Sequence, residues 1–490
     1  MRRRRFLATS GSVIAMLAAG RGIAQTEPSG YPRIINGPML GVPESDAITV
    51  WVRPSGAFEA RLEVSETEDF ARITASATQM ALAESDYCVT LRAGGLQPGG
   101  AYFYRVLIEN ALDRYTRSRA PHRAHTAPAE GTNVSFTLGF GSCARYQIDP
   151  VQPIWQQVQQ RNPDLFLWLG DNCYGDTTTP GFLREEMRRQ RDVLSLQPVL
   201  RSIPHLAIWD DHDYALNDSD RTNPVRKEAL EIFAQYWANP AYGLDDVPGV
   251  FFRYNYGGVD FFFLDGRYYR DPNDAPDVPG KTMLGARQKE WLKQQLSESC
   301  APFKCLVSGG SWTMAKGPSS DSWAAFLHER DEIFDFIRDQ AIEGVVLMSG
   351  DTHVGELNAI PWSRRGGYDL FDLVSSPLAQ NTERNWVTRT PEVRIRQPEA
   401  TSSNFGLITF DLSGPRASAT FRLVDIQGQE PWAPMKIYAD ELRNGVTSWD
   451  SKIDATSLAR HQGLLEGDAY FGSNYPEGYD PQAIFRDSAI

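Results

Sequence analysis

The sequence has few cysteines and no long apolar run beyond its N-terminus. Its five cysteines are Cys88, Cys143, Cys173, Cys300 and Cys305. This number is too small, and odd, for a disulfide framework, although Cys300 and Cys305 could pair if the chain is exported. No later segment is apolar over about 20 residues, so we expect no membrane-spanning segment in the mature chain. The sequence also has no internal repeat and no low-complexity tract.

Positive charge is in short supply over most of the chain. The 49 lysines and arginines are outnumbered by 62 aspartates and glutamates, which gives a formal net charge of −13. An acidic surface disfavours long polyanions such as duplex DNA. We therefore expect no stable nucleic-acid partner.

The N-terminus is the one strongly basic segment. Arg2–Arg5 precede a modestly apolar stretch, Val13–Ala19, and small residues follow at Gly22 and Ala24. This order is typical of an export signal, and the arginine pair resembles the twin-arginine type. We predict that residues 1–25 are a signal read by the twin-arginine export machinery, so that the mature protein is periplasmic or secreted. Its removal takes away five arginines and no carboxylate, and moves the net charge from −13 to −18.

The remaining chain has an ordinary globular composition, with 41% hydrophobic and 23% charged residues. A length of 490 residues fits two or three domains of roughly 100–200 residues each. From 32 to 128, short alternating runs such as Ile48–Val52 and Tyr102–Val106 are separated by Gly- and Pro-containing turns. This spacing predicts a β-sandwich, and the segment Leu96–Val106 resembles the fibronectin type III pattern, so we expect a fibronectin III-like β-sandwich.

From 133 to 490 the pattern changes to apolar runs that alternate with helical stretches. Runs such as Leu165–Leu169 and Val345–Met348 read as strands buried on both faces, and Ala286–Ser297 reads as a helix. Such alternation predicts a layered α/β domain. A later hairpin, Gly406–Leu412 with Ala417–Val424, is expected to be antiparallel, and the tail after it is weakly patterned.

Polar side chains follow four of these strands at the point where each strand ends. The endings are Gly141–Cys143, Gly170–Tyr174, Trp209–Asp213 and Ser349–His353. In open α/β sheets the active site is built at such carboxyl ends. Each ending alone is commonly a turn. Together they bring a thiolate, a phenolate, carboxylates and imidazoles to one edge, which favours a metal site.

The donor types indicate two unlike cations. A thiolate and a phenolate suit ferric iron or a similar transition metal, whereas carboxylate and amide oxygens suit Ca²⁺, Mg²⁺ or Mn²⁺. Two cations about 3.5–4 Å apart can bind both oxygens of an in-line displacement and can lower the pKa of a bridging water. They would also give an acidic protein the local positive charge that a small phosphate ester requires.

In order and spacing, the four endings resemble the alkaline phosphatase D (PhoD-like) family, a branch of the calcineurin-like and purple-acid-phosphatase-like metallophosphoesterases. The usual superfamily motifs begin with Asp-x-His and end with Gly-His-x-His. Here the first is Gly-Ser-Cys and the last is Gly-Asp-Thr-His, and both departures resemble the D family. The β-sandwich and the signal resemble it too, so the resemblance covers nearly the whole chain. It implies an αββα calcineurin-like metallophosphoesterase domain.

The resemblance also implies metal ligands. It assigns four residues to Fe³⁺: Cys143, Asp171, Tyr174 and His353. Asp171 would bridge to the second cation, Ca²⁺ or alternatively Mg²⁺, Mn²⁺ or Zn²⁺, and Asp351 would be a further ligand there. Asp211 and Asn217 are both candidates for that cation, and the sequence does not decide between them.

Three residues form the implied catalytic set: His212, Asp211 and Arg145. His212 matches the superfamily histidine that contacts the phosphoryl group or protonates the leaving oxygen. Arg145 could clamp the phosphate as a bidentate donor.

Neighbouring residues have plainer interpretations. Cys173 is expected to face the core, and Asp213 to orient a neighbour. Asp265–Arg267 ends another strand and lies either at the rim of the site or in an ordinary ion pair. His205 and His328 are expected to be structural or surface residues. Trp312 and Trp323 are expected either to pack in the core or to line the site.

The residues predict a metal-dependent phosphoric ester hydrolase. The leading prediction is hydrolysis of phosphate monoesters by a metal-bridging hydroxide. The alternative is phosphodiesterase or phospholipase D-type activity on the same core, which the loops Tyr268–Lys281 and Trp312–Trp323 would decide. A non-catalytic binding protein is suggested only by the β-sandwich, and the complete ligand set argues against it.

Overall fold

The computed structural model describes residues 31–112, 120–383 and 391–465, so the predicted signal lies outside the described residues. The N-terminal part forms two antiparallel sheets. One has the order β1 (Ile34–Leu40), β2 (Ala47–Pro54), β5 (Val89–Gly94). The other contains β4 (Ala75–Met80), β3 (Glu59–Ser65), β6 (Ala101–Ile108), β7 (Ala111–Leu112) and β8 (His122–His125).

Alternating apolar residues hold these two sheets together. Val50 and Leu91 of one sheet and Leu62 and Tyr104 of the other belong to one buried cluster. Strand β4 has no fully buried residue, which suits an edge strand that faces solvent. The predicted β-sandwich is therefore confirmed.

The second part contains two larger mixed sheets. The six-stranded sheet has the order β11 (His205–Ile208), β10 (Leu165–Leu169), β9 (Ser135–Gly141), β21 (Asn404–Asp411), β22 (Ser418–Asp425), β23 (Met435–Tyr438). The seven-stranded sheet has the order β14 (Phe252–Tyr256), β15 (Val259–Phe263), β16 (Phe303–Val307), β17 (Val345–Ser349), β19 (Leu370–Val374), β18 (Glu356–Ile360), β20 (Val393–Arg394). A short hairpin joins β12 (Gly243–Leu244) to β13 (Val247–Pro248).

These two sheets pack face to face through aromatic side chains. Phe410 of β21 contacts Phe261 and Phe303 of the other sheet, with ring centroids 6.2 and 5.6 Å apart. Strands β10, β16, β17 and β19 consist entirely of buried residues, as their mainly apolar sequences predict. The core of the domain therefore lies between the sheets and beneath the helices.

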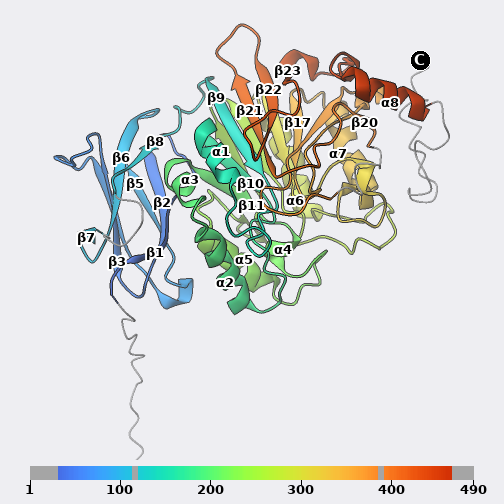
Figure 1. The fold of residues 1–490 in the computed structure, drawn as a ribbon. Helices are drawn as coiled ribbons and strands as arrows, with labels where there is room; N and C mark the ends of the chain where they lie inside the picture. The colour runs from blue at the N-terminus through green and yellow to red at the C-terminus, as the bar shows by residue number, and fades with distance from the viewer. Residues whose placement is uncertain (1–30, 113–119, 384–390, 466–490) are drawn as a thin grey trace, which may run out of the picture.

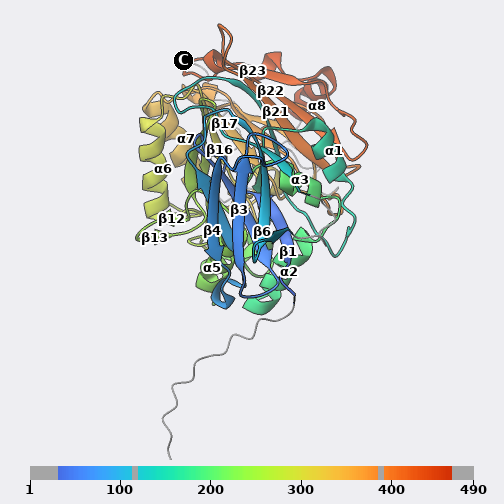
Figure 2. The same cartoon turned by 90° about the vertical axis from the view of Figure 1, so that its left-hand side faces the viewer.

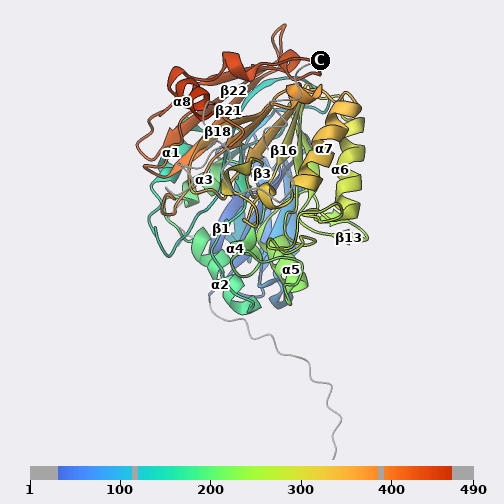
Figure 3. The same ribbon diagram turned by 90° about the vertical axis from the view of Figure 1, so that its right-hand side faces the viewer.

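Helices cover the outer faces. The first group is α1 (Ile154–Arg161), α2 (Pro180–Arg191), α3 (Gln197–Ser202), α4 (Asp211–Tyr214) and α5 (Arg226–Tyr236). The second group is α6 (Ala286–Glu298), α7 (Leu327–Asp339) and α8 (Ala455–Leu465). Figures 2 and 3 show α6 and α7 together on one flank, with α1 on the opposite flank. The predicted layered α/β architecture is confirmed.

The β-sandwich lies against the first group of helices (Figure 1). Trp51 donates its indole N–H to the carbonyl of Gln235 at 2.8 Å. Asp86 of the sandwich pairs with both Arg53 and Arg188, each at 3.0 Å, and Arg188 belongs to α2. None of the helices in the described ranges combines the length and apolar character needed to cross a bilayer.

Candidate active site

The carboxyl ends of the parallel strands in both sheets meet at one edge. Strands β9, β10 and β11 are parallel to one another, and so are β15, β16, β17 and β19. The loops after β9 and β19 join the two sheets there. The amide of Arg145 donates to the carbonyl of Ala379 at 2.8 Å, and that of Leu378 donates to Ser142 at 2.8 Å. The four sequence endings are thereby brought together.

The first cluster contains all four residues that were predicted to hold iron. The Cys143 sulfur lies 3.5 Å from a carboxylate oxygen of Asp171. The Tyr174 hydroxyl lies 3.2 Å from the same oxygen and 3.3 Å from Nε2 of His353. Cys143 and Asp171 are almost completely buried, so these donors face one another away from bulk water. This cluster is called the Cys143 cluster below.

The backbone at this edge adopts a conformation that L-residues rarely take. Four predicted ligands have positive φ: Cys143 at 63°, Asp171 at 52°, Asp351 at 67° and His353 at 55°. Each such residue costs of order 1–3 kcal/mol and persists only where surrounding structure holds it. Backbone strain at residues whose side chains converge is typical of functional sites.

Asp171 also belongs to a second cluster. Its carboxylate, that of Asp211 and the ring of His212 offer donor atoms within 4.8 Å of one another. Asp211 accepts the backbone N–H of Asp218 at 2.7 Å. Asn217 is exposed in the same loop. The structure groups Asp211 with Asp171, and the choice between Asp211 and Asn217 as a metal ligand stays a prediction.

Helix α4 is fixed by Asp213, which does not point to the clusters. Its carboxylate accepts the backbone N–H groups of Asp210, Asn172 and Cys173, each at 3.1 Å. It thereby ties the loop after β10 to the loop after β11, in line with its expected orienting role. Cys173 is buried in the hydrophobic core, again as expected.

His212 lies in strongly negative surroundings. It pairs with Asp176 through Nδ1, and its ring lies 4.1 Å from that of Tyr174. Burial lowers the pKa of His212, but the negative charges of Asp171, Asp211 and Asp176 outweigh it and raise the pKa to about 10. Without bound cations, these charges favour the protonated imidazole.

Arg145 is a second cationic side chain at this edge, and it is more exposed than His212. Its side chain is 33% exposed and lies 3.8 Å from Asp176. Its guanidinium also lies over the ring of Tyr174, 4.9 Å from the centroid. Arg145 and His212 thus share Asp176 as a partner, so the two predicted phosphate-binding residues are neighbours.

A third cluster contains residues that the sequence analysis did not assign to the site. The carboxylates of Asp210, Asp321 and Asp351 lie within 4.8 Å of one another. Lys316 pairs with Asp351, and buried Arg267 pairs with both Asp210 and Asp321. We call this set the Asp351 cluster. No motif marks Lys316 or Asp321 in the sequence, because both come from an irregular loop.

Asp265 and Arg267 are not at an exposed rim. Asp265 accepts N–H groups from Trp209, Arg267 and Val250 at 2.8–2.9 Å, which fixes the turn after β15. Arg267 is completely buried and also lies 3.7 Å from Asp211. Of the two alternatives predicted for this segment, a rim position and an ion pair, the structure shows the ion pair. The partners of Arg267 are Asp210 and Asp321, which belong to the Asp351 cluster.

The donor set fits bound cations. Burial, followed by the charge of neighbouring carboxylates, raises the pKa of Asp171 well above its ordinary value. Burial likewise raises the pKa values of Cys143 and Tyr174. One carboxylate oxygen of Asp171 and one of Asp210 are buried without a hydrogen-bond partner. A cation would supply both the missing partner and the missing positive charge.

The other predicted residues lie away from the clusters. His205 accepts a hydrogen bond from Trp168 at 3.0 Å within the core, as expected for a structural histidine. Trp312 and Trp323 are completely buried and stacked 4.3 Å apart, so they pack in the core. Cys300 is exposed and Cys305 is buried in β16, and both thiols are free.

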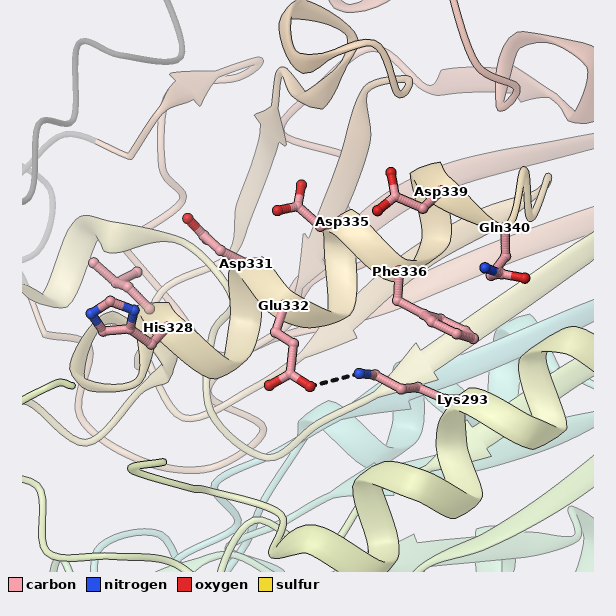
Figure 4. Close-up of a pocket in the computed structure, with 9 residues that line it drawn as sticks. Lys293, His328, Asp331, Glu332, Asp335, Phe336, Asp339 and Gln340 are labelled. Carbon is pink, nitrogen blue, oxygen red and sulfur yellow. Dashed lines mark hydrogen bonds and ion pairs between the residues drawn. The ribbon is translucent and has the colours of Figure 1, made fainter. Parts of the chain in front are cut away.

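A groove between α6 and α7 holds His328 and several acidic side chains, and has a volume of about 570 Å³ (Figure 4). Its carboxylates are paired with basic residues. Glu332 bonds to Lys289 and Lys293, and Asp335 pairs with Arg338. The groove is an ion-paired outer surface of these helices and does not include the three clusters.

A β-sandwich followed by two packed mixed sheets, with thiol, phenol, carboxylate and imidazole donors at one edge, defines a metallophosphoesterase fold. The PhoD-like phosphatase model matches residues 138–421, and the model of the N-terminal domain of PhoD-like phosphatases matches residues 20–128. The chain belongs to the PhoD-like phosphatase family, and it is a phosphoric ester hydrolase.

Individual relatives agree with this assignment. The chain is 26% identical over 422 residues to alkaline phosphatase D of Bacillus subtilis (strain 168), covering 72% of this chain and 71% of that protein. The solved structure of PhoD has a TM-score of 0.67 at 20% identity and covers 90% of this chain and 99% of its own. A purple acid phosphatase, PPD1 of yellow lupin seeds, has a TM-score of 0.56 at 14% identity, with 84% and 74% covered. The resemblance inferred from the motifs is confirmed, and the two structures confirm the fold.

Proposed function

We propose that the protein is an exported, metal-dependent phosphatase that hydrolyses phosphate monoesters. The observation that carries this proposal is the convergence of Cys143, Asp171, Tyr174 and His353 beside Asp211 and His212, with Asp171 common to both clusters. A shared carboxylate between a soft and a hard donor set suits two unlike cations.

The Cys143 cluster is the proposed Fe³⁺ site. Asp171, Asp211 and Asp351, with Asn217 as the alternative to Asp211, are the proposed ligands of Ca²⁺ or another divalent cation. When bound, the two cations supply Lewis-acid charge and make a water molecule nucleophilic at neutral pH. Buried carboxylates with raised pKa values and unpaired oxygens support this assignment.

The chain's own cations would act on the ester. Protonated His212, held by Asp176, would donate its proton to the leaving oxygen, and Arg145 would bind phosphoryl oxygens. Two cationic side chains beside the cation sites favour a terminal phosphate with two negative charges over a diester with one. This charge balance is the support for monoesters.

The proposal of export rests on the N-terminal residues. Arg2–Arg5 followed by an apolar stretch and small residues support a twin-arginine signal. This route carries folded protein, so the cations would be bound before the chain leaves the cytoplasm.

The test compares an alkyl phosphomonoester with its methyl diester on protein recovered after export by its own signal. We expect iron and a divalent cation by elemental analysis, a higher kcat/KM on the monoester, and loss of activity on chelation that added cation restores. Full activity in metal-free protein would overturn the metal-dependent mechanism. A higher kcat/KM on the diester would favour the phosphodiesterase alternative.

A further inference from the structure

Asp351 has a partner that competes with the proposed second cation. The ammonium group of Lys316 pairs with the Asp351 carboxylate. Lys316 is only 8% exposed, and its Nζ also lies 3.3 Å from the carbonyl of Asp321. A buried ammonium group beside this carboxylate occupies space that a divalent cation would need, and it neutralises the negative charge that would attract the cation.

Lys316 is held rigidly in this place. It ends a short 3-10 helix, Met314–Lys316, in the loop after β16. The N–H of Trp312 donates to Asp372 at 3.0 Å, and the N–H of Met314 donates to Glu392 at 3.2 Å. Both acceptors are completely buried, so the start of this loop is anchored and Lys316 is not a freely moving surface lysine.

The rest of the Asp351 cluster is also neutralised by the chain. Arg267 pairs with Asp210 and Asp321, and Arg270 pairs with Asp321 at 2.8 Å. The Cys143 cluster, in contrast, contains no lysine or arginine. The buried lysine and arginines therefore pair with carboxylates of the Asp351 cluster, whereas the more exposed Arg145 lies over Tyr174 of the Cys143 cluster.

We propose that Lys316 sets the affinity of the second cation by competing for Asp351, so that this cation is weakly held and exchangeable while the Cys143 cluster holds its cation tightly. This inference rests on the proposed two-cation function. Removing the lysine charge would free Asp351 and remove the repulsion of a nearby divalent ion. Repulsion between a monovalent and a divalent charge a few ångströms apart is worth about tenfold in affinity even at the dielectric constant of water.

The test is calorimetric titration of CaCl₂ into full-length protein from which labile cations have been removed with EGTA. Lys316→Met should bind Ca²⁺ at least about tenfold more tightly than the wild type, and Lys316→Arg should remain close to the wild type. Lys304→Met is the matched control. Lys304 is also buried, but its ammonium donates to the carbonyls of Ala301 and Glu343, at the opposite end of β16.

Thermal unfolding gives a second reading of the same variants. A ligand stabilises the folded state by RT ln(1 + L/Kd), where L is the concentration of free ligand, so the same excess of Ca²⁺ should raise the Tm of Lys316→Met more than that of the wild type. Lys316→Gln repeats both measurements if the methionine variant does not fold. Equal Ca²⁺ affinity in the wild type and the variant would overturn the proposed role of Lys316 but not the second cation itself. Absence of Ca²⁺ binding from every variant would overturn the second cation as well.

Discussion

Two neighbouring cysteines show how backbone conformation separates a proposed metal ligand from a core residue. Cys143 and Cys173 follow adjacent strands, β9 and β10, and both are buried. Cys143 has a φ of 63° and points to Asp171, whereas Cys173 packs in the hydrophobic core. The difference in direction, and not in burial or chemistry, gives the two thiols different roles.

Cys143→Ser should therefore lower iron content at least about tenfold and abolish most activity, because a hydroxyl is a far poorer anionic donor than a thiol. Elemental analysis and phosphatase assays measure the two effects. Cys173→Ser, which changes the same atom beside the same site, should keep its iron. Normal iron content and turnover in folded Cys143→Ser would contradict the assignment.

His212 should act on the leaving group. His212→Ala is expected to lose roughly 10²–10⁴-fold in kcat/KM on alkyl phosphates, because an alkoxide requires a proton donor. On nitrophenyl phosphate the loss should be smaller, because that leaving group is already stable. The ratio of the two losses is the measurement, with metal content checked alongside. Asp176→Asn should give an intermediate effect, since Asp176 pairs with the ring. Equal losses on both substrates would favour a purely electrostatic role.

At the scale of elements, the strands of the site could be predicted because they carry strong local signals. The range predicted for β10, Leu165–Leu169, agrees with the structure, and that predicted for β17, Val345–Met348, ends one residue before the observed Val345–Ser349. Strands β14, which has mixed burial, and β18, in which buried Glu356 and Asn358 interrupt the apolar pattern, were not predicted. Strand β23 and helix α8 lie in the tail that we interpreted as weakly patterned, because β23 has only four residues, too few to show a clear alternation.

The site itself was predictable only where residues follow strands. The Cys143 cluster comes from strand ends, and motif spacing marks each member. Lys316 and Asp321 come from the loop after β16, and Arg267 from the turn after β15. Their positions depend on buried tertiary contacts that no local pattern encodes, so the Asp351 cluster emerged only from the structure.

A buried ion pair helps to anchor the loop that carries Lys316. Arg330 of α7 pairs with Glu392 at 2.7 Å, and both side chains are completely buried. Glu392→Ala would leave the guanidinium without this carboxylate, so we expect a loss of roughly 3–5 kcal/mol in the free energy of unfolding. Urea unfolding measures it, and kcat/KM should fall because the loop loses an anchor.

A surface glutamate on the same helix provides the control. Glu332 pairs with Lys289 and Lys293 where α6 and α7 meet (Figure 4), but its side chain is 46% exposed. Solvent weakens such pairs, so Glu332→Ala should cost only about 0–1 kcal/mol. Similar losses in the two variants would show that burial of the Arg330 pair has no special effect.

For the whole molecule, Asp86 links the two parts of the chain. Burial raises its pKa, but hydrogen bonds and charge from Arg53, Tyr236 and Arg188 outweigh burial and hold the pKa below the ordinary 3.8. Because the folded value is the lower one, the stabilisation is fully present above about pH 4. It is lost as the pH falls through the folded value.

Asp86→Asn should therefore destabilise the protein by about 1–3 kcal/mol at pH 7, and this difference should shrink as the pH falls below 4. Thermal unfolding between pH 3 and 7 tests both statements. We also expect the sandwich and the catalytic part to unfold in less coincident steps. Asp440→Asn, which alters a half-exposed pair with Arg416, should change little. A pH-independent effect of Asp86→Asn would contradict the charge-based explanation.

Strand β9, which leads to Cys143, has its second neighbour far along the chain. Ser135 bonds to the carbonyl of Phe410 in β21, 275 residues later. Ribosomes add about 5–20 residues per second, so one edge of β9 waits roughly 15–55 s for its partner to be made. The six-stranded sheet therefore cannot close until the chain has been made as far as Tyr438, the last residue of β23. A ribosome that stops early releases a chain with an open β-edge, and quality control has that interval in which to recognise it.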